Sequence, residues 1–245
     1  MEIKKIVKIN NKYKLVLDNE VLITYDEIIL KENLLYKKII SIDKLNSIKK
    51  ETEVYNVYNK VVKMISKRYR SLFEINLYLE KNVNDLDKNF IINKLINNNL
   101  INDERYVKAY IYDKVNLSKE GPLLIKKELL KYNIDKKVID KYINEIDINI
   151  IYNKLEKLIK NKIKLNKGSK VTLYNKILLT YIEKGYDSSM IKEIFNLNYI
   201  ESKDNYIKEY NKIKTRLEKK YSGKELNNKI IQKLYQKGYN NIDIS

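Results

Sequence analysis

The chain of 245 residues contains no cysteine, no histidine and no tryptophan. Without cysteine there is no disulfide, no thiolate zinc site and no thiol nucleophile. Without histidine there is no Ser-His-Asp triad and no imidazole ligand for a metal. We therefore predict that the protein is not an enzyme, with no catalytic residue, no bound metal and no cofactor.

Glycine and proline are also scarce, with five glycines and one proline. None of the glycines lies in a GxxxxGK motif, so the sequence does not support an intrinsic ATPase. Proline interrupts helices, and one proline in the whole chain favours long helices without breaks.

Positive charge is abundant, because 50 Lys and Arg outnumber 32 Asp and Glu, a formal net charge of +18. Such a surface fits nucleic acid, an acidic protein or anionic lipid. The alternative is a merely solvated basic surface, since Lys, Asn, Ile and Tyr are all frequent, as an AT-rich genome would favour. No stretch approaches 18 consecutive apolar residues, and the start has no apolar signal core. We expect a cytoplasmic monomer that does not bind membranes.

Apolar residues make up 44% of the chain, which is enough for a substantial core. Over residues 1–25, apolar residues alternate with lysines between the turn signals Asn10-Asn11 and Asp18-Asn19, which predicts an antiparallel hairpin or meander. Asp26 is the expected N-cap of a short helix. From about residue 52, apolar residues recur at helical spacing, beginning with Tyr58, Val61 and Val62.

An internal repeat organises the helical part. Asn82, Asn133, Gly185 and Gly238 each follow a helical pattern and precede an apolar residue, at steps of 51, 52 and 53 residues. Asn and Gly tolerate the left-handed conformation that ends helices.

Each unit of the repeat reads as three helices, which in the first unit lie near 54–66, 72–81 and 87–97. Ser71 with Glu74 and Ser222 with Glu225 predict capping boxes, and Asp135 and Asp187 predict N-caps. We divide the chain into a β-containing region at 1–50, repeats at 54–102, 103–148 and 149–202, and a truncated repeat at 203–245. The predicted fold is mainly α, with tandem three-helix repeats in an elongated curved array after a small N-terminal hairpin or meander.

Three stretches resemble the RecX regulatory proteins in order and spacing. Residues 66–79 resemble R-x-R-S-x-x-E-L-x-x-x-L, residues 100–106 resemble G-Y-[IL]-[DN]-D-x-[RK]-[FY]-A, and residues 120–135 resemble K-G-P-x-x-I-x-x-E-L-x-x-K-G-I. Asn82 and Asn133 depart from the pattern by replacing its usual glycines. The resemblance covers residues 55–146, and residues 149–245 match only as repeat units.

The resemblance implies a non-enzymatic modulator of the RecA recombinase. Such proteins lie in the groove of the RecA filament on single-stranded DNA. They inhibit ATP hydrolysis, strand exchange and filament growth. A basic helical-repeat protein that binds DNA or RNA directly is an alternative, and a carboxylate-dependent nuclease is a weaker one.

The candidate contacts are basic residues. Residues 151–245 hold 21 basic and 10 acidic residues, a formal net charge of +11. The residues that we predict to contact the partner or DNA are Lys67, Arg68, Arg70, Arg105, Lys160, Lys162, Lys164, Lys167, Lys170, Lys212, Lys214, Arg216, Lys219 and Lys220.

The arginines stand out because only four occur among so many lysines, and arginine makes bidentate contacts that lysine cannot copy. The alternatives are that Arg105 pairs with an internal carboxylate and that Arg68 and Arg70 fasten neighbouring helices. The 22 tyrosines follow the apolar stripes, so we assign most of them to the core and not to base stacking. Acidic pairs such as Asp103-Glu104 fit helix caps better than Mg²⁺ ligands.

Overall fold

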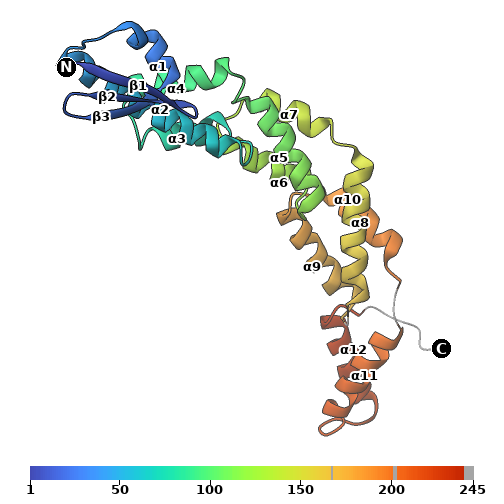
Figure 1. The fold of residues 1–245 in the computed structure, drawn as a ribbon. Helices are drawn as coiled ribbons and strands as arrows, with labels where there is room; N and C mark the ends of the chain where they lie inside the picture. Colours follow the sequence, from blue (N-terminus) through green and yellow to red (C-terminus); the bar gives the residue numbers. More distant parts are fainter. Residues whose placement is uncertain (167, 201–202, 240–245) are drawn as a thin grey trace. The chain divides into compact units, whose positions relative to one another are not determined.

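The computed structural model describes residues 1–166, 168–200 and 203–239. Helices dominate it, and a single small sheet lies at the N-terminal end of the described residues (Figure 1). Close contacts divide the chain into two compact units, Met1–Tyr106 and Val107–Ser245. The predicted helical fold with an N-terminal meander is confirmed.

The sheet of the first unit has three antiparallel strands in the order β1 (Ile3–Ile9), β2 (Lys12–Leu17) and β3 (Val21–Tyr25). The turn between β1 and β2 uses Asn10 at a φ of 51°, which asparagine tolerates better than most residues. Ile6, Leu15 and Leu22 are paired across the sheet, and they face a core in which Leu15 is fully buried.

Three helical elements follow the sheet: α1 (Asp26–Lys31), the 3-10 helix η1 (Leu34–Tyr36) and α2 (Ile42–Ile65). Asp26 is the first residue of α1 and not its cap, because Tyr25 occupies the N-cap position. The Ser41 side chain caps α2, so this helix starts well before the predicted residue 54. Its early turns bury Leu45 and Ile48 against the sheet.

Helices α3 (Leu72–Leu79) and α4 (Asp85–Asn97) pack with the second half of α2 around Val61, Ile75 and Ile91. The predicted capping box of Ser71 and Glu74 is confirmed. Asn82 is not among the residues with positive φ. Its side-chain amide instead donates to the carbonyl of Tyr78, so it serves the helix end without a left-handed backbone.

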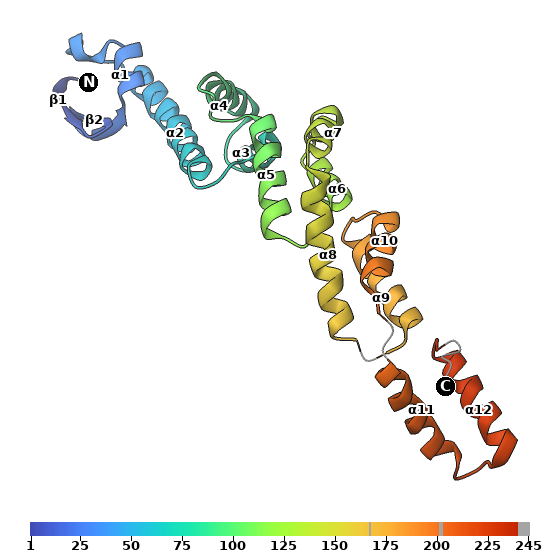
Figure 2. The same cartoon turned by 90° about the vertical axis from the view of Figure 1, so that its right-hand side faces the viewer.

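The second unit contains most of α5 (Asp103–Leu117), then α6 (Pro122–Leu130), α7 (Lys136–Asn144), α8 (Ile148–Lys164), α9 (Lys170–Glu183), α10 (Ser188–Asn198), α11 (Lys203–Leu217) and α12 (Gly223–Gln236). Helix α8 lies beside α9 and α10, and α11 lies beside α12 (Figure 2). The repeat boundaries given above stay a prediction.

Asp residues at helix starts and Asn or Gly residues after helix ends mark several boundaries of these helices. Asp135 and Asp187 accept backbone hydrogen bonds as N-caps, as predicted. The left-handed conformation predicted at Asn133, Gly185 and Gly238 is confirmed. The predicted box of Ser222 and Glu225 is wrong. Ser222 is the N-cap of α12, but its side chain makes no capping hydrogen bond.

Two middle helices meet end to end through their main chains. The Gly121 N–H, just before α6, donates to the Lys184 carbonyl at 2.7 Å, and the Leu123 N–H donates to the Gly185 carbonyl at 3.1 Å. Added Cβ atoms would lie 2.5 Å from the Gly185 oxygen at Gly121 and 2.2 Å from the Leu124 nitrogen at Gly185. Glycine at both positions therefore permits this approach.

A related junction joins α9 to α12. The Ser169 hydroxyl, at the start of α9, donates to the Lys237 carbonyl at 2.7 Å. The Thr172 hydroxyl donates to the same oxygen at 3.3 Å. The end of α9 thus meets the start of α6 through main-chain hydrogen bonds, and the end of α12 meets the start of α9 through hydroxyl groups.

A lysine secures the start of α8 against α5. The Lys154 ammonium donates to the carbonyls of Val115 at 2.9 Å and Glu120 at 3.0 Å. Burial lowers the pKa of Lys154. For Lys114, burial alone would lower the pKa, but hydrogen bonds to Glu120 and Glu128 outweigh burial and raise the pKa.

In the described part of the chain, no helix has the length and apolar character needed to cross a membrane.

We predict that Gly121→Ala lowers the free energy of unfolding by about 1–3 kcal/mol, because the new methyl overpacks the junction. Urea denaturation followed by circular dichroism measures the change. Gly168→Ala is the matched control, since its Cβ would meet only the Asn166 side-chain oxygen at 3.5 Å. Equal stability of the two variants would contradict the role of the junction.

Candidate functional site

The turn between α2 and α3 holds two arginines on one carboxylate. Glu74 Oε1 accepts from Arg68 Nη2 at 2.6 Å and from Arg70 Nη1 at 3.1 Å. Its other oxygen, Oε2, accepts from the Ser71 N–H as part of the capping box. Glu74 therefore holds both guanidinium groups at the start of α3. These hydrogen bonds attach the turn after α2 to α3, which supports part of the alternative that Arg68 and Arg70 fasten neighbouring helices.

These arginines border an open hollow of about 430 Å³, which we call the arginine hollow. Among the described residues that line it are four cations and no Asp or Glu. The lining residues are Ile65, Ser66, Lys67, Arg68, Tyr69, Arg70, Asn99, Leu100, Asn102 and Arg105. Such a lining favours an anionic group.

Arg105 reaches the hollow from the first turn of α5, and its Nη1 lies 3.5 Å from the Asn99 carbonyl. In the described residues no carboxylate pairs with Arg105, against the alternative of an internal ion pair. Asn99 has a φ of 53° at the end of α4, and this turn brings the carbonyl to the arginine. The fold thus gathers all three N-terminal candidate arginines at one place.

Free hydrogen-bonding capacity remains at the hollow. Each guanidinium has five N–H donors, and the hydrogen bonds that involve Arg68 use Nη1 and Nη2. Arg70 Nε, in contrast, is buried and is not part of this capacity, although it has no partner among the described residues. The hollow therefore offers donors and positive charge together, which is the chemistry that recognises phosphate or carboxylate.

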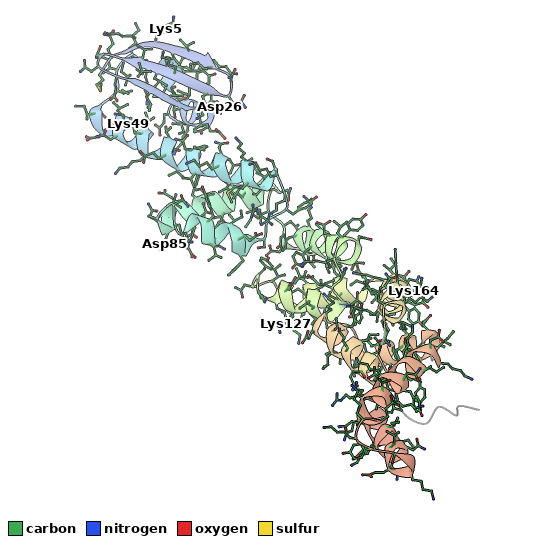
Figure 3. All side chains as sticks on the ribbon, turned by 90° about the horizontal axis from the view of Figure 1, so that it is seen from below. Lys5, Asp26, Lys49, Asp85, Lys127 and Lys164 are labelled. Atoms are coloured by element: carbon green, nitrogen blue, oxygen red, sulfur yellow. The ribbon has the colours of Figure 1, made fainter. Side chains whose placement is uncertain are left out.

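The first lysine cluster lies where α8 ends and α9 begins. Lys162 and Lys164 are exposed in the last turn of α8, where Figure 3 labels Lys164. Lys160 pairs with Glu156 at 3.0 Å. Lys170 opens α9, and its ammonium lies 5.5 Å from the centre of the Tyr199 ring. Lys167 lies outside the described residues.

The second lysine cluster is on α11 and the turn after it. All five of its side chains are exposed: Lys212, Lys214, Arg216, Lys219 and Lys220. Lys212 and Arg216 line a small hollow of about 80 Å³ together with Lys233, Lys237 and Glu209. Lys237 forms an ion pair with Glu209.

The structure keeps the two lysine clusters apart within the second unit. The Asn205 amide, near the start of α11, lies 3.4 Å from the Asn166 carbonyl beside the first cluster. The second cluster lies at the other end of the same helix. The arginine hollow belongs to the first unit.

Sequence reasoning missed three residues. Tyr69 is 59% exposed and lines the arginine hollow, whereas the sequence predicts that most tyrosines belong to the core. Its position between Arg68 and Arg70 was the available signal. Lys233 of α12 and Lys237, the residue after this helix, line the hollow beside Lys212 and Arg216. Only the pairing of α11 and α12 brings them to the second cluster. Asp103, which is predicted to be part of a helix cap and not a Mg²⁺ ligand, accepts a hydrogen bond from the Leu72 N–H at 2.8 Å. It thus pairs a free N–H group in the first turn of α3.

These features define a mainly helical protein that presents cations in one hollow and at two helix ends. A family model described as "RecX, second three-helix domain" matches residues 102–143. The chain is 32% identical to regulatory protein RecX of Streptococcus uberis, over 100% of this chain and 97% of the relative. It is 31% identical to regulatory protein RecX of Streptococcus agalactiae, over the same shares. The chain belongs to the RecX family of regulatory proteins.

Solved structures agree with this fold. A crystal structure of a regulatory protein RecX has a TM-score of 0.68 and 19% identity, and the match covers 80% of this chain and 98% of the other. A crystal structure of RecX from Lactobacillus salivarius has a TM-score of 0.54 and 26% identity, over 59% of this chain and 95% of the other.

We predict that Arg70→Ala costs about 1–2 kcal/mol of unfolding free energy, because Arg70 is 24% exposed and its hydrogen bond to a carboxylate is partly shielded. Arg68→Ala should cost at most about 0.5 kcal/mol, because Arg68 is 52% exposed. Urea titration of both variants at one ionic strength tests the order. A larger loss for Arg68→Ala would show that the Arg68 ion pair is the structural one.

Proposed function

We propose that this protein binds the filament that RecA forms on single-stranded DNA, as a monomer and without chemistry of its own. On binding, it inhibits ATP hydrolysis, strand exchange and filament growth. The observation that carries the proposal is the match to regulatory protein RecX over 100% of this chain and 97% of the relative. The arrangement of cations supports it, because a nucleoprotein filament presents both phosphates and acidic side chains.

In this proposal the arginine hollow receives an anion of the filament. Glu74 is a positioning residue, because it holds Arg68 and Arg70 while other guanidinium donors stay available. The exposed ring of Tyr69 adds a flat surface beside those donors. The lysine clusters contribute longer-range attraction, since their described side chains are exposed and a lysine ammonium acts as a point charge without the bidentate donor geometry of arginine.

A second candidate function is direct binding of DNA or RNA. It is favoured by the exposed cations of the second lysine cluster, five within nine residues. Direct binding would follow phosphate charge alone and would not require RecA.

Co-sedimentation separates the two candidates. We expect the protein to pellet with RecA on single-stranded DNA, and to bind the same DNA more weakly when RecA is absent. Parallel assays should show that it slows RecA-dependent ATP hydrolysis. Equal binding with and without RecA would favour the direct nucleic-acid function, and no binding to the filament would refute the proposal.

We further predict that Lys162→Gln, Lys164→Gln and Lys170→Gln together weaken filament binding and flatten its dependence on salt, because fewer counterions are released. The unfolding free energy should change little, since exposed charges contribute little to stability. Binding measured from low to high salt tests this. The matched control replaces three exposed lysines elsewhere in the same unit, Lys127, Lys136 and Lys137, and should leave the salt slope as it was.

A further inference from the structure

The connection between α1 and α2 presents large apolar side chains to solvent. Tyr36 is 88% exposed, Ile39 is 72% exposed and Ile42 is 66% exposed, and Leu35 is also exposed. We call residues 35–42 the exposed apolar segment. A soluble protein leaves single apolar residues at its surface, but several within eight residues indicate an interaction site.

The segment is held firmly at its base. Leu34 and Ile40, which flank the most exposed residues, are buried in the core under the sheet. The Ile3 N–H donates to the Lys38 carbonyl at 2.8 Å, and the Ile40 N–H donates to the Met1 carbonyl at 2.9 Å. Tyr36 and Ile39 are thus displayed from a fixed backbone, so a partner would pay little for ordering it.

The charge of the segment is entirely positive. Lys37 and Lys38 are exposed between Tyr36 and Ile39, and residues 33–42 include no Asp or Glu. Along the chain the nearest acids are Glu32 and Asp43, and Glu32 forms an ion pair with Lys44. From the N-terminal end, Glu2 lies opposite Ile39 in an isolated β-bridge. A complementary surface combines an apolar depression with carboxylates at its rim.

We infer that the exposed apolar segment is a docking site for an acidic protein surface with an apolar depression, in which Tyr36 and Ile39 are buried. This inference rests on the proposed function, under which the surface belongs to the RecA side of the filament and not to its DNA. The arginine hollow and the exposed apolar segment would then divide the contacts by chemistry, the first taking an anionic group and the second taking apolar protein surface.

Two other occupants fit the segment less well. Single-stranded nucleic acid is bound by successive aromatic platforms, and the aliphatic side chains of Leu35, Ile39 and Ile42 give no stacking surface. A second copy of this chain, in a symmetric contact, would bring Lys37 and Lys38 of both copies toward each other, and the segment itself supplies no acid to pair with them. Protein interfaces, in contrast, place Tyr and branched aliphatic side chains at their centre.

The test is the double variant Tyr36→Ser with Ile39→Ser in the full chain. We expect its affinity for RecA on single-stranded DNA to fall at least about 30-fold, the loss typical of one removed anchor residue. Its affinity for the same DNA without RecA should not change. The double variant Lys37→Gln with Lys38→Gln should weaken filament binding less and flatten its salt dependence. Thermal melting of every variant checks that the fold is intact.

The matched control is Leu86→Ser with Leu117→Ser, which removes two equally exposed apolar side chains outside the segment and should leave filament binding unchanged. If the wild type binds the filament and the Tyr36 and Ile39 variant binds equally well, this inference fails and the proposed function stands. If the wild type does not bind the filament, the proposed function fails.

Three further results would overturn the inference that the exposed apolar segment binds an acidic protein surface. The first is loss of DNA binding in the Tyr36 and Ile39 variant without RecA. The second is wild-type binding to phosphatidylserine vesicles that the variant loses. The third is a wild-type dimer in sedimentation equilibrium that the variant converts to monomer.

Discussion

The second unit depends on a main-chain contact between helix ends. The first turn of a helix has N–H groups without partners inside the helix, and leaving them buried and unpaired is costly. Before and within α6, Gly121 and Leu123 donate to the carbonyls at the end of α9. The junction requires backbone atoms to approach where side chains normally stand, and glycine allows this on both sides. The relative placement of α6 and α9, and of the lysines that flank α9, follows from it.

Local chemistry explains which parts of the fold the sequence predicts well. Helix ends that use a residue's own side chain or its own backbone freedom, such as Asp187 and Gly185, are visible from neighbouring letters. The sequence does not reveal the start of α2, because the first turns of this helix are rich in Lys, Asn and Ser. Two apolar residues of these turns, Leu45 and Ile48, are buried only because they pack against the sheet. Thr52 is likewise buried, and its hydroxyl shares a hydrogen bond with that of Thr24, 28 residues earlier.

The candidate site was predictable as a set of residues and not as an arrangement. Arg68 and Arg70 stand out by residue type, because arginine is rare in this chain. That both lie on the carboxylate of Glu74 depends on the conformation of the turn. Arg105 comes from another helix and is placed by the left-handed turn at Asn99. Only its position between Arg68 and Arg70 distinguishes Tyr69 from the core tyrosines in the sequence, since its exposure depends on the packing around α2 and α3.

Helix α2 joins the core under the N-terminal sheet to the core of the first helical bundle. Leu45, Ile48 and Tyr55 belong to the core under the sheet, whereas Tyr58 and Val61 belong to the core with α3 and α4. A continuous helix loses backbone hydrogen bonds wherever it is interrupted, so both cores share one cooperative element. The sheet therefore stabilises the bundle of α2, α3 and α4 through the helix that the two cores share. Amide protons along α2 should exchange with solvent at similar rates, and a fragment that begins after residue 50 would lose the first nine of the 24 residues of that shared helix.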